Sequence, residues 1–246
     1  MPFHKILKPK YNYDLIRIGR DNDGGYLVEK KSFENTECLI SLGINDDWSF
    51  EEDFLKKNII IKCFDDELDE KFLLKKIIIQ FIFVFYSINF SLLKKNISNY
   101  FSFLRIKKKI QFNKKKISYN DLNKILSQET NNIFLKIDIE GHEYRILDDL
   151  LLNQKKIIGL VIEFHDCDLH LEKIIKFLNS FNLTLVHIHG NNYSVKELNR
   201  NPEAIELTFS KKSLHLNNKT NDKLYPIADL DFPNSKRSPD VKLSFK

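Results

Sequence analysis

The sequence predicts an α/β fold built on a mostly parallel sheet, and three observations lead to this prediction. Strand-like and helix-like segments alternate along most of the 246 residues, as they do in parallel βαβ units. The apolar run at 134–138 ends in acids and a glycine before an amphipathic stretch, as a buried parallel strand does at its carboxyl end. A second apolar run, 38–43, closes on Gly43. We expect a single domain over 1–246.

The first half of the chain is expected to hold a hairpin, a glycine turn and a capped helix. Residues 15–29 predict two short strands around an Asn-Asp-Gly-Gly turn, which is typical of a β-hairpin. After the strand at 38–43, Ser49 and the acids that follow it offer a capping box to a helix that ends at Lys57. Two further strands are predicted at 58–64 and 110–112.

Strands and helices alternate again in the second half. Ser118 is placed to cap a helix that ends at Leu126. The segments beyond it are assigned by hydrophobic periodicity and by the turn residues between them. The predicted strands are 134–138, 157–165, 184–190 and 204–210, the predicted helices are 144–151 and 169–180, and 211–246 is a C-terminal extension.

The segment 71–109 departs from this alternation. It is long, rich in Ile and Phe, and carries lysines at both ends. We predict a helical insertion between the second and third strands, with one or two helices packed on the sheet and extended as a lid or an oligomer face. Its apolar centre, Ile77–Leu93, is slightly shorter than a spanning helix needs and contains Gln80. No transmembrane segment is therefore expected, whereas weak surface contact with a membrane stays an alternative.

Composition and charge narrow the functional classes. With 42% hydrophobic and 30% charged residues, the chain has enough apolar side chains for a core and is not a disordered protein. A net charge of +5 tolerates an anionic ligand but does not require nucleic acid. Cys38, Cys63 and Cys167 have no paired spacing and are predicted as buried reduced thiols. The first residues lack the apolar core of a signal peptide, so we expect a cytoplasmic protein.

The acids after the strand at 134–138 indicate a functional site. In open α/β sheets, ligands bind outside the carboxyl ends of the strands. Asp138 and Glu140 are two residues apart and face the same side if the strand stays extended. The preference for acids at a helix N-terminus explains Glu143, but it does not explain Asp138, which lies inside the apolar run. We therefore predict a functional role for Asp138.

The turn after the strand at 38–43 suggests a nucleoside-type cofactor. Gly43 at the strand tip lets the backbone approach a ligand closely. Asp65, at the tip of the next strand, is placed to bind both hydroxyls of a ribose, and the alternative is a solvated acid in the run 65–70. The G-x-G-x-x-G fingerprint is missing, which lowers the expectation of a nicotinamide cofactor.

A set of motifs spread along the chain is shared with one known family. The motifs are RIGRDNDGGY (17–26), SLGINDDWSFEED (41–53), FDD (64–66), LKIDIEGHE (135–143), IEFH (162–165), HGNN (189–192), LDFPN (230–234) and SPDVKLSF (238–245). With these motifs the chain resembles the FkbM-type S-adenosylmethionine-dependent methyltransferases, over most of its length except 71–109. The turn after Gly43 departs from the pattern because it has no second glycine, and no clear adenine-binding acid follows 110–112.

The resemblance implies a fold, an activity and a cofactor site. The fold would be the class I methyltransferase (Rossmann-like) sheet of seven strands, mostly parallel with the last strand antiparallel. The family mostly methylates oxygen on sugars, polyketides and other small metabolites. The methionine part of S-adenosylmethionine would lie at Gly43 and its neighbours, the ribose at Asp65, and the sulfonium near Asp138. The residues expected to bind the cofactor are Gly43, Asn45, Ser49, Glu51, Asp65, Asp66 and Asp138.

The tips of the later strands are candidates for the acceptor side. Glu163 and His165 are two apart, as are His187 and His189, so each pair faces one side of its strand. Methylation of a hydroxyl needs a group that removes a proton, which suits a histidine. His165 or His189 is the expected base, with His142 as a third candidate and His187 as a core residue. The predicted catalytic residues are Asp138, His165 and His189, and the predicted substrate-binding residues are Tyr26, Glu140, Glu163, Asn191 and Asn192.

The resemblance thus implies an S-adenosylmethionine-dependent O-methyltransferase. The resemblance, supported by the His, Asn and acid residues at the strand tips, leads us to expect a sugar hydroxyl as the acceptor, in a nucleotide-activated sugar or in a surface or capsular polysaccharide. Asp138, Glu163 and His165 could also hold Mg or Mn, but hard-metal sites usually contain more carboxylates, so a metal is not favoured. One alternative is a nucleotide-sugar or glycan-binding module without turnover. Another is a nucleic-acid methyltransferase, supported only by the lysine runs 107–109 and 114–116, which lack interleaved aromatic residues. No oligomeric state follows from the sequence.

Overall fold

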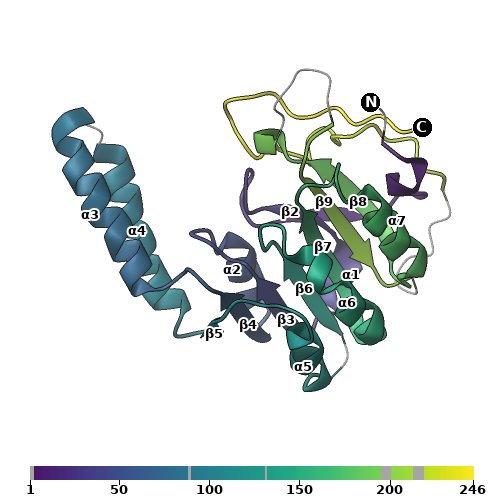
Figure 1. Ribbon diagram of the computed structural model, residues 1–246, viewed down its shortest axis with the longest axis horizontal. Coiled ribbons are helices and arrows are strands. Elements are labelled where there is room, and N and C mark those ends of the chain that lie inside the picture. Colours follow the sequence, from purple (N-terminus) through teal and green to yellow (C-terminus); the bar gives the residue numbers. More distant parts are fainter. Residues whose placement is uncertain (1–2, 88–89, 131, 195–200, 213–218) are drawn as a thin grey trace.

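A computed structural model describes residues 3–87, 90–130, 132–194, 201–212 and 219–246 of the chain (Figure 1). Its centre is a seven-stranded sheet in the order β5-β4-β3-β6-β7-β9-β8. The first five strands of that order pair in parallel, and β9 runs antiparallel to both of its neighbours. The predicted α/β fold with a mostly parallel sheet is confirmed. The strands are β3 (Cys38–Leu42), β4 (Ile60–Asp65), β5 (Gln111–Lys114), β6 (Ile133–Ile137), β7 (Ile157–Phe164), β8 (Thr184–Gly190) and β9 (Ile205–Ser210).

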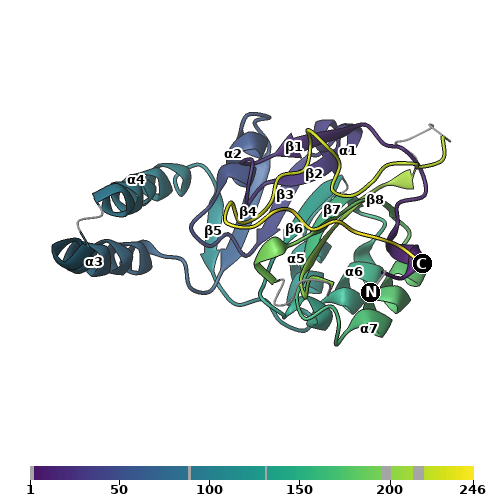
Figure 2. The same cartoon turned by 90° about the horizontal axis from the view of Figure 1, so that it is seen from above.

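The central strands are buried on both faces, as near-continuous apolar runs predict. Along β3, Leu39 belongs to one core cluster, whereas Ile40 and Leu42 belong to the other, because successive side chains of a strand point to opposite faces. Figure 2 shows α1, α2 and the hairpin on one side of the sheet and α5, α6 and α7 on the other. These helices are α1 (Lys30–Glu34), α2 (Ser49–Leu55), α5 (Asp121–Ser127), α6 (Leu147–Asn153) and α7 (Leu171–Ser180).

The predicted hairpin is confirmed, but two predicted helix caps are wrong. β1 (Leu15–Ile18) pairs antiparallel with β2 (Tyr26–Glu29) around the Asn-Asp-Gly-Gly turn. Ser49 is the first residue of α2 rather than its cap, and its hydroxyl accepts a hydrogen bond from the backbone N–H of Arg20. Ser118 does not cap α5 either: its backbone N–H donates to the carboxylate of Asp121. Both caps were assigned from local spacing alone; a tertiary contact with Arg20 decided the partner of the Ser49 hydroxyl, whereas α5 begins one residue after Asn120, with no side-chain cap.

The helix predicted at 144–151 is shorter than expected. A 3-10 turn at Glu143–Arg145 precedes α6, which begins only at Leu147. Glu143 is fully buried, and its Oε1 accepts hydrogen bonds from the backbone N–H groups of Ile139 and Gly141. Glu143 is thus the acid in the first turn of this 3-10 helix rather than of α6. Glu143 also holds the turn that follows β6.

The segment 71–109 forms two helices, α3 (Glu70–Ser87) and α4 (Phe90–Ile106), between β4 and β5. They pack on each other and project from the rest of the molecule as a helical arm (Figure 1). The expectation that they pack along the sheet is wrong, since only the base of the arm reaches the core, through Leu73, Phe103 and Ile106. Among the described residues, none of the helices is long and apolar enough to cross a membrane.

The C-terminal extension ties the two ends of the chain together. The backbone of Phe3 is hydrogen-bonded to Ser244 and Lys246, so the termini lie side by side (Figure 1). Further along the extension, Pro233 accepts a hydrogen bond from Asn22 in the hairpin turn, and Leu230 accepts one from Arg17. The extension therefore braces the hairpin against the sheet. Cys38, Cys63 and Cys167 are all free and buried, as predicted.

Candidate active site

Two adjoining pockets open at the carboxyl ends of β3, β4, β6 and β7, where an open α/β sheet binds its ligands. The first, which we call the inner pocket, has a volume of about 340 Å³ and reaches from the hairpin turn to β7. The second, the outer pocket, has a volume of about 300 Å³ and lies over the ends of β3 and β4. Both volumes suit small-molecule ligands. The two pockets share three lining residues: Asn45, Asp138 and Glu140.

The turn after β3 is built so that only glycine fits at its start. Gly43 has a φ of +76°, and a Cβ at this position would lie 1.7 Å from the backbone oxygen of Asp138. The Gly43 N–H donates to the backbone oxygen of Phe64 on β4, and its carbonyl accepts from Lys136 on β6. The turn is therefore held between two strand ends. Gly43, predicted to bind the cofactor, lines the outer pocket.

Asp65 anchors the same turn from the tip of β4. Its Oδ2 accepts hydrogen bonds of 2.9 Å from the backbone N–H groups of Ile44 and Asn45. Its Oδ1 accepts from Glu67 and Leu68 in the loop that follows. Asp65 is thus the hub between two loops and also lines the outer pocket, as a ribose-binding acid must. Asp66 lines the same pocket and lies 3.9 Å from the Lys116 ammonium.

Lys136 lies under the turn at Gly43 and was missed by the sequence analysis. It is 3% exposed, and its Nζ donates a 2.8 Å hydrogen bond to the Gly43 carbonyl. Burial opposes its charge, but the carboxylates of Glu51 and Asp138 outweigh this effect and raise the pKa of Lys136. The available signal was a lysine in the middle of an otherwise apolar strand, which rarely stays buried without partners.

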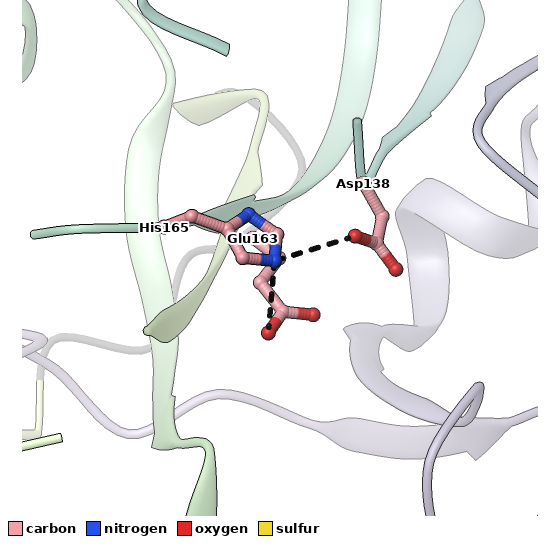
Figure 3. A group of neighbouring side chains, drawn as sticks. All are labelled: Asp138, Glu163 and His165. Atoms are coloured by element: carbon pink, nitrogen blue, oxygen red, sulfur yellow. Dashed lines mark ion pairs between the residues drawn. The ribbon is translucent and has the colours of Figure 1, made fainter. Parts of the chain in front are cut away.

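Asp138, Glu163 and His165 converge in the inner pocket (Figure 3). The His165 Nε2 lies 3.9 Å from Asp138 Oδ1 and 3.9 Å from Glu163 Oε1. Burial raises the pKa of Asp138 to about 6, with Lys136 and His165 acting against the rise. Burial likewise raises the pKa of Glu163 well above its usual value, and the Asp138 carboxylate adds to this effect. The site thus gathers two carboxyl groups whose ionisation depends on nearby cations.

His165 carries a proton at neutral pH. Burial lowers its pKa, but the hydrogen bond from Nδ1 to Glu143 and the charges of Glu163, Glu143 and Asp138 win and raise it to about 9. The hydrogen bond to Glu143 is 3.1 Å long, and the exposed carboxylate of Glu140 lies 3.3 Å from Nε2. His165 therefore supplies a positive charge beside the acids of the pocket.

Asp138 and Glu140 line the same pockets, but not because they face one side of an extended strand, as was expected. β6 ends at Ile137, and Glu140 has a positive φ of 51°. The two acids therefore reach the same pockets through a turn rather than along an extended strand. Gly141, which follows, also has a positive φ. His142, the third candidate base, lines the outer pocket.

His189 and Asn192 do not line either pocket. His189 is 3% exposed, and its ring nitrogens lie 3.2 Å from Glu206 and 3.0 Å from Asp240. Asn192 donates hydrogen bonds to backbone oxygens of the C-terminal extension, at Ser235 and Ser238. Both side chains contact that extension instead of lining a pocket. Sequence reasoning assigned them by their distance from a strand tip, which does not show which face they occupy.

Tyr26, Ser49 and Glu51 also lie behind the pocket walls. The Tyr26 hydroxyl donates to Asp138 at 3.3 Å. Glu51 is fully buried, accepts a 2.5 Å hydrogen bond from the hydroxyl of Ser41 and lies 3.9 Å from Lys136. Tyr26 and Glu51 thus support Asp138 and Lys136, whereas the Ser49 hydroxyl accepts from the backbone of Arg20. None of the three lines a pocket.

Asn191, which was predicted to bind substrate, and several residues that were not predicted complete the lining of the two pockets. Asn191 lines it and donates a 2.7 Å hydrogen bond to Glu163. The hairpin turn contributes acidic and glycine residues, although the sequence analysis used this turn only as a fold signal. Lysines after β5 close the outer pocket where no adenine-binding acid had been found. The lining residues missed by the sequence analysis include Asp23, Gly24, Asp46, Asp47 and Tyr193 in the inner pocket and Lys115, Lys116 and Ile117 in the outer one.

Asp138, Glu163 and His165 also form the one cluster of possible metal ligands among the described residues. One donor atom from each of Asp138, Glu163 and His165 lies within 4.8 Å of the others, which is the ligand mixture of a Mg or Mn site with one imidazole. A metal would have to displace the proton of His165, because metal ligation needs the neutral ring. The donor set therefore fits a metal, but protonated His165 balances part of the acidic charge without one.

The sheet order, the glycine turn, the acid at the tip of β4 and the shared acid after β6 define a class I methyltransferase, which uses S-adenosylmethionine. The model of the FkbM methyltransferase domain matches residues 17–195. The chain belongs to the FkbM methyltransferase family, as the sequence resemblance predicted.

The chain is also similar to solved structures of methyltransferases. An rRNA methylase from Streptococcus thermophilus is 8% identical, with 73% of this chain and 91% of that chain covered and a TM-score of 0.40. A TehB-like S-adenosylmethionine-dependent methyltransferase from Corynebacterium glutamicum is 12% identical, with 72% and 82% covered and a TM-score of 0.38. Likenesses at this level carry no information about the acceptor. The comparison with curated proteins gives no match.

Proposed function

We propose that the protein transfers a methyl group from S-adenosylmethionine to a sugar hydroxyl, in a nucleotide-activated sugar or in a surface or capsular glycan. The observation that carries this proposal is the position of Asp138 at the junction of two pockets. A transfer between two small molecules needs two sites that meet at the reacting atoms. In this proposal the outer pocket takes the cofactor and the inner pocket takes the acceptor.

The residues of the outer pocket fit the cofactor. Gly43 leaves no room for a side chain beside the Asp138 backbone, so the turn can lie close to a ligand. Asp65 lines this pocket at the tip of β4, and we assign it to the ribose. When bound, S-adenosylmethionine would supply a methyl group on a positively charged sulfur. The carboxylates of Asp138 and Glu140, shared by both pockets, would favour that positive charge.

Asp138 is our candidate for the base that takes the hydroxyl proton. As the acceptor oxygen forms its bond to the methyl carbon, the bond from that carbon to sulfur breaks, and the hydroxyl proton must leave. With a pKa of about 6, Asp138 is mostly ionised at neutral pH and free to accept a proton. His165, with a pKa of about 9, already holds one. The expected histidine base is therefore replaced by a carboxylate, with His165 as its positively charged neighbour.

The lining of the inner pocket supports a neutral acceptor with several hydroxyls. Carboxylates accept hydrogen bonds, and the amide of Asn191 and the ring of His165 can donate them. The pocket also contains Asp23, Asp46 and Asp47. This acidic lining disfavours a phosphate at the reacting end of the acceptor, which argues against nucleic acid as the substrate. The diphosphate of an activated sugar would have to lie outside the inner pocket.

We place the reaction in the cytoplasm, where the three free buried cysteines are stable in the reduced form. The test is a mass-spectrometric screen of nucleotide sugars and glycans with isotope-labelled S-adenosylmethionine, with Asp138→Asn as the matched inactive control. The proposal expects one labelled methyl on a sugar oxygen. A labelled methyl on a protein, a lipid or a nucleic acid, with every sugar unlabelled, would refute the sugar acceptor. The assignment as a methyltransferase would still hold. Cofactor binding without any turnover would favour a binding module instead.

A further inference from the structure

The helical arm has a charge pattern unlike that of the rest of the chain. The segment 71–109 contains nine of the 39 Lys and Arg residues and none of the 34 Asp and Glu residues. The remainder of the chain therefore carries 30 cations against 34 acids. The net positive charge of the protein comes from the arm alone. None of the methyl-transfer chemistry described above uses these cations.

The arm also exposes most of the large apolar side chains found at the surface. Ten of the seventeen exposed large hydrophobic residues among those described lie on α3 and α4. Phe81, Phe83, Phe90 and Phe101 each expose between 54% and 63% of their surface. Exposed apolar side chains that occur singly are ordinary, but a contiguous set indicates a partner or a membrane. These side chains keep more than half of their surface exposed in the isolated chain, so a partner or a membrane can cover them.

We propose that the arm docks on the surface of an anionic lipid bilayer. α3 is almost entirely apolar from Ile77 to Phe83, and Lys94 and Lys95 lie exposed on the neighbouring helix α4. Apolar side chains that enter the interfacial region, next to lysines that meet anionic headgroups, are the composition of a surface-bound helix. None of the described helices could cross a bilayer, so the arm would lie in the surface and not span it.

The charge of the arm argues for lipid and against a second copy of the arm. Two arms packed side by side would bring Lys94, Lys95 and the other cations of two 71–109 segments together, and the only acid on the helices themselves is Glu70, which already pairs with Lys107. Like charges in close contact disfavour such a pair, whereas anionic headgroups neutralise them. A bilayer can also cover the long apolar surface of α3 and α4 without the complementary shape that a protein partner would need.

The base of the arm is attached to the loop that lines the inner pocket. Lys76 on α3 forms a 2.9 Å ion pair with Asp46, and Asn99 on α4 donates to the backbone oxygen of the same residue. Trp48 donates a 3.0 Å hydrogen bond to Ser102 and packs on Phe103. A docked arm would therefore hold the pocket at a fixed distance from the bilayer. The docking itself does not depend on the identity of the acceptor.

Co-sedimentation with lipid vesicles tests this proposal. The purified full chain is mixed with vesicles of phosphatidylcholine containing phosphatidylglycerol, and with vesicles of phosphatidylcholine alone. We expect sedimentation with the anionic vesicles and much less with the neutral ones. The double variant Phe81→Gln/Ile82→Gln should lower the partition coefficient at least about tenfold, because two large apolar side chains no longer enter the interface. Lys94→Glu/Lys95→Glu should lower it as well, and added salt should weaken wild-type binding.

Matched variants on the body separate the arm from general effects. Leu152→Gln removes an exposed apolar side chain from α6, and Lys30→Glu/Lys31→Glu reverses two exposed lysines on α1. Neither should change sedimentation. Unchanged thermal unfolding of the arm variants would show that they still fold, since their altered side chains lie outside the core. The proposal is overturned if wild type stays in the supernatant with all vesicles, or if the arm variants sediment like wild type. The proposal is also overturned if wild type forms a dimer without vesicles and the Phe81→Gln/Ile82→Gln variant does not, because a second copy would then cover the arm.

Discussion

The protonation of His165 gives the sharpest test of the site. Its pKa is raised to about 9 by Glu143 and by the acids of the inner pocket, against the effect of burial. A rise from 6.5 to about 9 corresponds to about 3 kcal/mol of preference for the charged ring in the folded protein. The His165 side chain is 20% exposed, so solvent screening removes only part of this value. We expect Glu143→Gln to remove a large share of it.

The substitution is chosen to change charge and little else. A glutamine at 143 keeps an oxygen that accepts from the N–H groups of Ile139 and Gly141, so the turn after β6 stays supported. It loses the negative charge that faces the His165 Nδ1. Glu140→Gln is the matched control, because its carboxylate lies 3.3 Å from Nε2 but is 79% exposed. Screening by water should make its effect small.

The sign of the effect on stability follows from the direction of the pKa shift. Because the folded pKa of His165 lies above its unfolded value, its contribution to stability is complete below about pH 6.5 and is lost as the pH rises through about 9. The free energy of unfolding should therefore fall less in Glu143→Gln than in wild type when the pH rises from about 6 to about 9.5, a range that brackets the two pKa values. The measurements are NMR titration of the His165 ring and urea unfolding at both pH values, with chelator present. An unchanged His165 midpoint in Glu143→Gln, or an equal shift in Glu140→Gln, would refute the reasoning.

Four further predictions follow from the same site. Asp65→Ala should weaken S-adenosylhomocysteine binding, measured by calorimetry, by about 1–3 kcal/mol, because buried polar groups lose their partner; an unchanged affinity would contradict its role. Asp138→Asn should lower turnover at least about 100-fold with little change in melting temperature. Wild-type initial rates should rise with pH through about 6 and then level off. If the variant keeps this rise in rate, Asp138 is not the base. Gly43→Ala should lower the urea-unfolding free energy by on the order of 1–3 kcal/mol, because of its positive φ and the Asp138 oxygen; wild-type stability would contradict the tight turn. Thorough chelation with EDTA should leave turnover unchanged, and a loss restored by Mg or Mn would show that Asp138, Glu163 and His165 hold a metal.

Local pattern was enough to predict the strands, most of the helices and the residues at the strand tips. Buried parallel strands are apolar throughout, so β3, β6 and β7 are visible without any knowledge of their neighbours. Gly43 and Asp65 follow from the same logic, because a strand tip is defined by the end of an apolar run. The family motifs added the cofactor and a seven-stranded sheet whose last strand is antiparallel, which periodicity alone does not specify.

Tertiary structure decided which polar residues at those tips reach a ligand. His165 and His189 look alike in sequence, two residues after an acid or a histidine, yet one lines the inner pocket and the other is clamped by Glu206 and Asp240. The partners of His189 come from β9 and from the C-terminal extension, far away along the chain. No local pattern encodes such contacts, because they depend on where the chain returns to the sheet.

The sequence by itself determined an α/β methyltransferase with an acidic strand tip and an unusual basic, apolar insertion. Only the tertiary structure showed that the insertion stands away from the sheet and that Asp138 lies between two pockets. It also showed that Lys136 is buried beneath the turn at Gly43. The physical reason is that strands and helices are set by the burial of neighbouring side chains along one segment. Pocket walls and pKa values are set instead by charges and packing contributed by segments that meet only in the folded chain.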